Sequence, residues 1–177
     1  MIQGQLAGLR ARHADDVAVL HAELYEDVAT RSRADSRPWR PLAASAGHSP
    51  YEPAAPTDDA AVFSVVERAS GELAGEALLW GIDTHNRCAH LGISLLPGSR
   101  GRGLGAETVH LLCRYGFIVR GLHRLQVDTL ADNTAMISAA RRAGFTLEGT
   151  LRRSAWVSGE FVDEVVLGLP VDEWKQP

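Results

Sequence analysis

A glycine-rich loop is the segment of this sequence whose residue types point most directly to chemistry. It reads Arg100-Gly101-Arg102-Gly103-Leu104-Gly105 and lies between a predicted strand that ends at Leu96 and a predicted helix that begins at Ala106. Glycines allow several backbone N–H groups to point into one concavity, and a helix N-terminus adds unpaired donors and a positive dipole end. The two arginines of the loop would supply positive charge. The loop therefore predicts a pyrophosphate-binding site, and a glycine turn without a ligand is the alternative interpretation.

Two known phosphate-binding motifs can be compared with this loop. The GxxxxGK[ST] string of P-loop proteins does not occur in the sequence. The dinucleotide pattern G-x-G-x-x-A is present from Gly101 to Ala106, and Asp128 ends a predicted strand about twenty residues later. However, the strand before the loop follows other strands instead of opening a βαβ unit, and only 71 residues follow Ala106. An NAD-binding fold is therefore disfavoured.

Metal and thiol chemistry are also disfavoured. His85, Cys88 and His90 are close in sequence, but His85 lies in a predicted turn and no fourth ligand is evident. We therefore expect no metal. Cys113 falls on the apolar face of a predicted helix, where a buried thiol is the ordinary interpretation. Trp80 is expected to pack in the core or on the sheet, and the same holds for Trp156.

Length and composition limit the class of protein. The chain has 177 residues, and its 18 basic side chains against 22 acidic ones argue weakly against a nucleic-acid partner. It has two cysteines and no apolar run long enough for a membrane span or a signal segment. We expect a cytoplasmic protein with one domain over residues 1–177, without a disulfide framework or a membrane partner.

The elements that must position the loop follow from turn signals and hydrophobic periodicity. Asp15 and Asp16 are candidate N-caps for a helix that carries Val17, Leu20 and Leu24. The region 31–59 holds five prolines and is predicted to be irregular, as either a surface insertion or a lid that faces the substrate. Elsewhere we predict strands at 6–12, 61–68, 73–82, 88–96, 124–130, 145–156 and 160–169, and helices at 106–119 and 133–143. Strands and helices alternate only in the second half, which favours a mixed sheet.

The order of four motifs resembles the GNAT superfamily of N-acetyltransferases. Arg100-x-x-Gly103-x-Gly105 is similar to its R/Q-x-x-G-x-G/A loop, and Asn133 followed by a helix and Gly144-Phe145 is similar to its asparagine-to-GF segment. Gly149-Thr-Leu-Arg152, Gly159-Glu-Phe-Val-Asp163 and Glu173-Trp174 resemble the branch that acetylates ribosomal-protein N-termini and spermidine. The resemblance runs from about Leu73 to the C-terminus.

This resemblance implies a fold and a co-substrate. The expected fold is the α/β acyltransferase fold, with a mixed, twisted, seven-stranded sheet, flanking helices and a V-shaped split between strands 88–96 and 124–130. The pantetheine arm of acetyl-CoA would lie in the split. The implied cofactor-binding residues are Ile93, Ser94, Leu95, Arg100, Gly101, Arg102, Gly103, Leu104, Gly105 and Asn133. A backbone N–H near Ser94 or Leu95 would polarise the thioester carbonyl, while Asn133 is equally interpretable as a helix N-cap.

The resemblance also indicates where the proton-transfer groups should lie. His90 occupies the place of a glutamate in the related A-E-x-G setting and could accept the proton of the amine. Glu76 on the neighbouring strand is the second candidate for the base, and Ser94 completes the predicted catalytic set. The tyrosine that often protonates the leaving thiolate is replaced by Ala140.

Two functions remain after this comparison. The first is acetyl transfer from acetyl-CoA to a primary amine, which could belong to a protein N-terminus, a polyamine or a small molecule. The second is a non-catalytic module that binds acyl-CoA, because the usual acid is missing at Ala140. Members of the family often form homodimers, and the sequence leaves the oligomeric state open.

Overall fold

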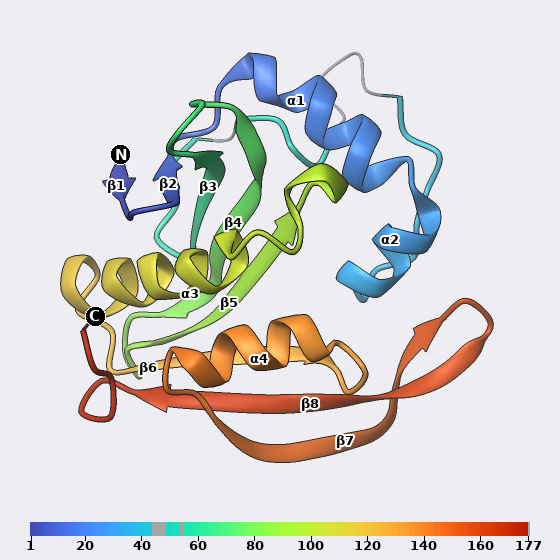
Figure 1. The fold of residues 1–177 in the computed structure, drawn as a ribbon. Helices are drawn as coiled ribbons and strands as arrows, with labels where there is room; N and C mark the ends of the chain where they lie inside the picture. Colours follow the sequence, from blue (N-terminus) through green and yellow to red (C-terminus); the bar gives the residue numbers. More distant parts are fainter. Residues whose placement is uncertain (44–48, 54, 177) are drawn as a thin grey trace.

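A computed structural model describes residues 1–43, 49–53 and 55–176 of the chain (Figure 1). Its strands are β1 (Ile2–Gln3), β2 (Ala7–Arg10), β3 (Ala60–Glu67), β4 (Leu73–Asp83), β5 (Cys88–Leu95), β6 (Arg124–Leu130), β7 (Thr146–Val157) and β8 (Glu160–Pro170). Its α-helices are α1 (Ala14–Leu20), α2 (Val28–Ala34), α3 (Leu104–Arg114) and α4 (Thr134–Arg142). Short π-helical segments, His21–Tyr25 and Tyr115–Val119, continue α1 and α3, and a 3₁₀ turn spans Pro97–Ser99.

One mixed sheet carries the strands in the order β1-β2-β3-β4-β5-β6-β8-β7. All neighbouring strands are antiparallel except β5 and β6, which are parallel. The mixed α/β class is therefore confirmed, but the predicted count of seven strands is too low, because β1 adds a two-residue edge strand. Two residues are too short for alternating hydrophobicity to signal a strand.

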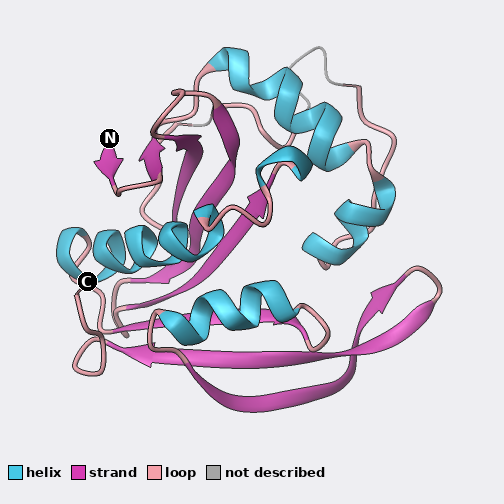
Figure 2. Cartoon of the chain, viewed as in Figure 1, coloured by secondary structure: helices cyan, strands magenta, loops and turns pink. Residues whose placement is uncertain are grey.

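Helices cover both faces of this sheet (Figure 2). Side chains from α3 and α4 share the main core with alternate residues of the central strands, such as Leu79, Leu91, Leu125 and Leu167. The intervening residues face the other side, where Ser64 on β3 donates a hydrogen bond to Asp16 on α1 (2.7 Å). The period of two along each strand thus separates an apolar face from a polar face.

The start of α1 and the region 31–59 differ from the sequence predictions. His13 is the N-cap residue of α1, and Asp16 stands in the first turn, where it accepts a hydrogen bond from the backbone N–H of His13 (2.9 Å). The prediction of Asp15 or Asp16 as the N-cap is therefore wrong. The region 31–59 is less irregular than expected, because α2 extends to Ala34 and Tyr51 is buried against α1. Part of that region, residues 44–48 and 54, lies outside the described residues.

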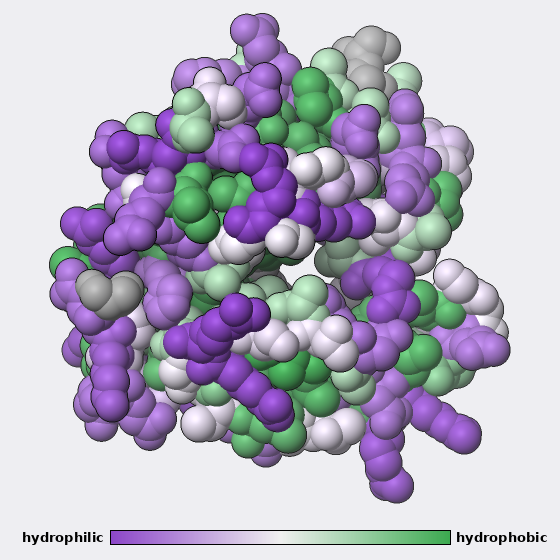
Figure 3. All heavy atoms as spheres, viewed as in Figure 1, coloured by the Kyte–Doolittle hydropathy of each residue, from purple (hydrophilic) through white to green (hydrophobic). Residues whose placement is uncertain are grey.

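The sheet splits between β5 and β6. The two strands pair only from Cys88 to His90 and from Arg124 to Gln126. Beyond these residues β5 continues alongside β4 to Leu95, while β6 continues alongside β8 to Leu130. The space-filling view shows the surface hollowed between the part with α1 and α3 and the part with α4 (Figure 3). The V-shaped split therefore lies between the two strands predicted to form it.

Candidate active site

The glycine-rich loop connects the free end of β5 to the N-terminus of α3. Gly103 is the N-cap residue of α3 and has a φ of +83°, and Gly101 has a φ of +73°. Glycine adopts these left-handed conformations without the penalty that a Cβ atom brings. The first backbone N–H groups of α3 have no partner within the helix, so the loop presents donors and the positive end of the helix dipole. Leu104, in contrast, is buried and anchors the loop to the core.

A carboxylate fixes the first turn of α3. Glu107 accepts hydrogen bonds from the backbone N–H groups of Gln5, Leu6 and Ala7 at 2.5, 2.6 and 2.5 Å. Three amide donors offset its negative charge and direct it toward the N-terminal strands. Glu107 thereby ties the first turn of α3 to the N-terminal strands.

The two arginines of the loop have protein partners. The Nε of Arg100 donates a hydrogen bond to the carbonyl of Leu95 (3.1 Å). Arg102 forms an ion pair with Glu67 at the end of β3. Both side chains are exposed, so the cost of redirecting them toward an anionic ligand is small.

The edge of β5 that faces the split carries free backbone groups. The N–H of Leu96 donates to the carbonyl of Ala74 (2.9 Å), and amide directions alternate along a strand. The amides of Ile93 and Leu95 therefore face the split, whereas that of Ser94 faces β4. Of the two backbone donors expected near the thioester, Leu95 has the orientation that the role requires.

Asn133 has two structural roles in the protein. Its Oδ1 accepts a hydrogen bond from the N–H of Met136 (3.2 Å), so it is the N-cap of α4. Its Nδ2 donates to Oγ1 of Thr129 on β6 (2.9 Å). The N-cap interpretation is confirmed, and contact with a pantetheine arm stays a prediction.

His90 lies where β5 and β6 begin to separate, on the polar face of the sheet. Its Nδ1 is 2.5 Å from Oδ2 of Asp128 on β6, and the other oxygen of that carboxylate accepts from Nε2 of Gln126 (2.9 Å). Burial alone would raise the pKa of Asp128, but the hydrogen bonds from His90 and Gln126 outweigh it and hold the pKa below its usual value. Trp80 stacks on the imidazole at 4.2 Å between ring centroids. The imidazole is therefore held by a carboxylate at its edge and by an indole on its face.

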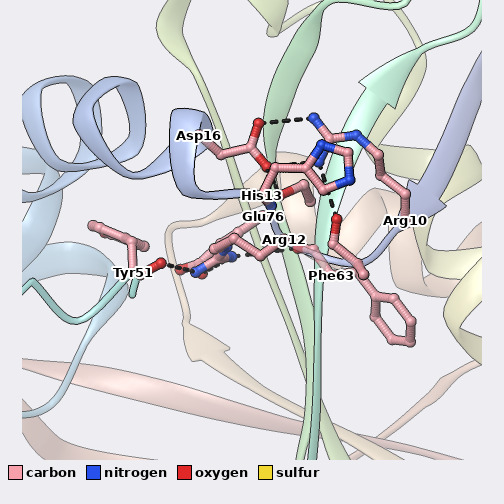
Figure 4. A network of polar contacts seen from close by, with 9 residues as sticks. Arg10, Arg12, His13, Asp16, Tyr51, Phe63 and Glu76 are labelled. Atoms are coloured by element: carbon pink, nitrogen blue, oxygen red, sulfur yellow. Dashed lines mark hydrogen bonds and ion pairs between the residues drawn. The ribbon is translucent and has the colours of Figure 1, made fainter. Parts of the chain in front are cut away.

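Glu76 lies on the same face, directly opposite Ser94 in the β4–β5 register. It forms an ion pair with Arg12, whose Nη2 is 2.8 Å from Oε2 (Figure 4). The Arg12 side chain is only 4% exposed, and its guanidinium also lies 5.5 Å from the ring centre of Tyr51. Burial and the nearby Glu76 charge raise the pKa of Tyr51 to about 12. The carboxylate of Glu76 is thus engaged by a buried cation, whereas the Nε2 of His90 has no hydrogen-bond partner among the described residues.

The loop, the split and the strand edge can be compared with known proteins. A family model described as "Acetyltransferase (GNAT) domain" matches residues 7–146. The chain belongs to the GNAT family of acetyltransferases.

Two curated acetyltransferases have sequences similar to this chain. The chain is 31% identical over 96 residues to the spermidine N(1)-acetyltransferase of Escherichia coli K12, an alignment that covers 54% of this chain and 52% of the relative. It is 29% identical over 105 residues to the putative ribosomal N-acetyltransferase YdaF of Bacillus subtilis, covering 59% of this chain and 57% of the relative. The matches therefore span little more than half of these curated relatives.

Solved structures extend the similarity to nearly the whole chain. The crystal structure of the Vibrio cholerae spermidine N-acetyltransferase in complex with CoA and spermine superposes with a TM-score of 0.78. The superposition covers 95% of this chain and 97% of that one, at 18% sequence identity. It supports the GNAT fold over nearly the whole chain.

The tyrosine that often protonates the leaving thiolate in the GNAT family is replaced by Ala140 in this chain. This residue is fully buried, and its carbonyl accepts the backbone N–H of Phe145 as α4 ends (3.1 Å).

Cys113 is also fully buried, and burial raises the pKa of its thiol to about 12. In the part of the chain that the structure describes, no group of three or more His, Cys, Asp or Glu side chains is arranged to hold a metal ion. No helix there is both long and apolar enough to cross a membrane.

Trp80 and Trp156 lie in strands of this GNAT protein but outside its core. Trp80 and Trp156 are 44% and 61% exposed. Trp80 packs on His90, and Trp156 packs edge-on against Phe161 across the β7–β8 hairpin. Both therefore pack on the sheet, which is one of the two alternatives that the sequence left open.

Two charged partners in the site have no clear signal in the sequence. The pattern indicates Asp128 only as the acidic residue of a dinucleotide motif, and it indicates no role for Arg12. Alternation along 124–130 places Asp128 on the polar face, but its approach to His90 depends on the β5–β6 register. Arg12 follows a short strand, and nothing in its neighbourhood in the sequence indicates burial beside Glu76.

Proposed function

We propose that this protein transfers an acetyl group from acetyl-CoA to a primary amine by direct attack. The observation that carries the proposal is the split between β5 and β6, whose open strand edge leads into a glycine loop at the N-terminus of α3. An extended amide-containing arm fits beside a free strand edge, and a pyrophosphate fits the donors of a helix N-terminus. We assign both to one domain over residues 1–177.

Each part of the donor has a proposed set of protein groups. The amides around Gly101–Gly105 hold the pyrophosphate, with charge from Arg100 and Arg102. The backbone groups of Ile93 and Leu95 bind the pantetheine amides and polarise the thioester carbonyl. Asn133 contacts the pantetheine from the other side of the split.

The acceptor amine needs a base because an alkylammonium has a pKa near 10 and is protonated at pH 7. We assign this role to His90, with Glu76 as the second candidate. In this assignment, His90→Ala lowers the rate mainly below the pH at which the amine loses its proton unaided. An unaltered pH–rate profile would remove His90 as the base and favour Glu76.

The acceptor class is supported only by similarity. One curated relative acetylates spermidine and another is named as a putative ribosomal acetyltransferase. We therefore propose a panel of acceptors: spermidine and spermine, short peptides with free N-termini, and small primary amines. Release of free CoA thiol reports turnover with each of them.

Calorimetric titration with acetyl-CoA, beside NAD as a control, tests the donor assignment first. Binding of acetyl-CoA at micromolar strength without binding of NAD supports the proposal, and failure to bind acetyl-CoA would overturn it. Binding without thiol release with any amine of the panel would favour a non-catalytic module that binds acyl-CoA. The buried alanine at the position of the usual acid is the observation that favours this second function.

The protein is expected in the cytoplasm. Both cysteines are free thiols, as is usual in the reducing cytoplasm where we place the protein. We treat a homodimer as the oligomeric form to test, by light scattering with and without acetyl-CoA.

A further inference from the structure

We propose that Asp128 is a positioning residue, which fixes the tautomer and orientation of His90 so that Nε2 accepts the proton of the acceptor amine. This inference rests on the proposed acetyl transfer and adds a residue to it. The observation behind it is the contact of 2.5 Å between Nδ1 of His90 and Oδ2 of Asp128, made between two strands that are about to diverge.

The carboxylate of Asp128 is itself held in place. Its Oδ1 accepts from Nε2 of Gln126 (2.9 Å), and Oε1 of Gln126 lies 3.4 Å from Nη2 of Arg124. Arg124 is paired in turn with Glu148 on β7, at 2.8 Å between Nη1 and Oε1. Because both oxygens of Asp128 have partners, the carboxylate cannot rotate without losing one of them.

This arrangement decides which ring nitrogen carries the proton. An ionised carboxylate can only accept hydrogen bonds, so Nδ1 of His90 must be the donor. The neutral imidazole then keeps the lone pair of Nε2 for an incoming proton. The pKa of Asp128 is lowered, so it stays ionised while His90 changes charge.

Two groups flank the imidazole of His90. On β4, Trp80 presents its ring to one face of the imidazole, and an indole face attracts a cation. On β6, Asp128 faces the ring with a negative charge. The nearest positive group on that strand, Arg124, is engaged by Glu148.

The proposed reaction conserves atoms and charge over one turnover. The N–H bond of the acceptor ammonium breaks as an Nε2–H bond forms, which leaves a neutral amine and an imidazolium beside the Asp128 carboxylate. The amine attacks the thioester carbon, and its nitrogen gives a second proton to solvent as the C–S bond breaks. The departing thiolate takes one proton from solvent. The imidazolium then returns its proton to solvent, so each turnover releases one proton.

The decisive variant is Asp128→Asn, because an asparagine amide can donate to Nδ1 and so favours the wrong tautomer. The matched control is Asp172→Asn, an exposed aspartate beyond β8 that makes no contact with His90. At pH 7 we expect Asp128→Asn to lower kcat by about 100-fold, within the usual range for loss of a general base. The KM for acetyl-CoA and the melting temperature should stay close to those of the control.

A pH series separates positioning from a purely structural role. The deficit of Asp128→Asn should shrink as the pH approaches the pKa of the amine, since a free amine needs no base. It should also shrink at pH 7 with an acceptor amine of low pKa. A deficit that stays constant with pH, or no deficit at all, would overturn the inference.

Nitrogen-15 spectra of the histidine rings test the pairing without turnover. His90→Gln identifies the signals of this ring, and His85→Gln, in the exposed β4–β5 turn, is the control. We expect the Nδ1–H tautomer in the native protein and the Nε2–H tautomer in Asp128→Asn; the same tautomer in both would overturn the inference. If no amine is acetylated, the proposed function fails, whereas the ring spectra still decide whether Asp128 sets the tautomer of His90.

Discussion

Two arginines that precede α1 each pair with a carboxylate, one on α1 itself and the other on β4. Arg10 binds both oxygens of Asp16 at 2.6 and 2.7 Å, and Arg12 binds Glu76. These contacts lie together on the polar face of the sheet (Figure 4). At the scale of single residues, this face is therefore held by paired charges, each of which depends on its partner.

Asp16 gives a stability prediction with a defined pH dependence. Burial alone would raise its pKa, but hydrogen bonds from Arg10, His13 and Ser64 hold the pKa well below its usual value. Its contribution to stability is therefore present at neutral pH and is lost as the pH falls below about 4, where the unfolded carboxyl takes up its proton. We expect Asp16→Asn to lower the free energy of unfolding by about 3 kcal/mol at pH 7, and by much less near pH 2.

Urea unfolding at several pH values measures this effect. Asp15→Asn is the control, since Asp15 is the exposed neighbour on the same helix. A loss that is equal at pH 7 and at pH 2 would contradict the role assigned to the Asp16 charge.

Gly103 gives a prediction for the loop. A Cβ at this position would lie 3.3 Å from Cδ1 of Leu6 and would stand on a backbone with a φ of +83°. Gly103→Val should weaken acetyl-CoA binding at least about tenfold, which corresponds to about 1.4 kcal/mol, because the amides of the loop can no longer converge. Calorimetry compares it with Gly105→Ala, whose Cβ makes an ordinary contact at 3.6 Å with Leu95. Unchanged affinity in Gly103→Val would remove the loop as the pyrophosphate site.

At the scale of elements, α3 and α4 both begin at residues that the proposed site uses. Gly103 of the loop caps α3, and Asn133, shortly after the end of β6, caps α4. A cap sets where a helix begins and therefore where its free N–H groups point. The same residues can thus serve the fold and the ligand.

Two substitutions at Asn133 separate these roles. Asn133→Ala should lower the free energy of unfolding by about 1 kcal/mol, because the N-cap is lost. Asn133→Asp keeps a good N-cap but cannot donate through Nδ2. If Asn133 also contacts pantetheine, acetyl-CoA affinity falls in the aspartate variant while its melting temperature stays near that of the native protein. Native affinity in that variant would leave Asn133 with the capping role alone.

At the scale of the whole molecule, the split divides one sheet into two halves. β1–β5 carry the loop, and β6–β8 with α4 form the other wall. The halves are hydrogen-bonded to each other in the sheet only near Cys88–His90. A ligand that spans the split should therefore hold the two halves together.

Acetyl-CoA should accordingly stabilise the whole fold. At a concentration about 100 times its Kd, linkage predicts an increase of about 2.7 kcal/mol in the free energy of unfolding. Thermal unfolding followed by circular dichroism measures the shift, and NAD should produce none. Gly103→Val should lose most of the shift at the same concentration. A native protein whose melting temperature does not respond to acetyl-CoA at that excess would contradict binding across the split.

The sequence by itself determined the elements and the loop. Alternation and turn residues predicted the strands from Ala60 to Pro170 within a few residues, and the glycine pattern predicted the loop. The GNAT fold and the place of the split were implied by the resemblance of the loop and of Asn133 to motifs of that family. These signals are local, because a period of two, a glycine at a positive φ and a helix cap each depend on near neighbours.

Only the tertiary structure decided the partners of the charged residues. Asp128 reaches His90 because β5 and β6 pair in one register for three residues, and Arg12 reaches Glu76 across β3. Such contacts join residues 38 and 64 positions apart. Strand register and the packing of α1 fix them, and no local pattern in a single sequence encodes either one.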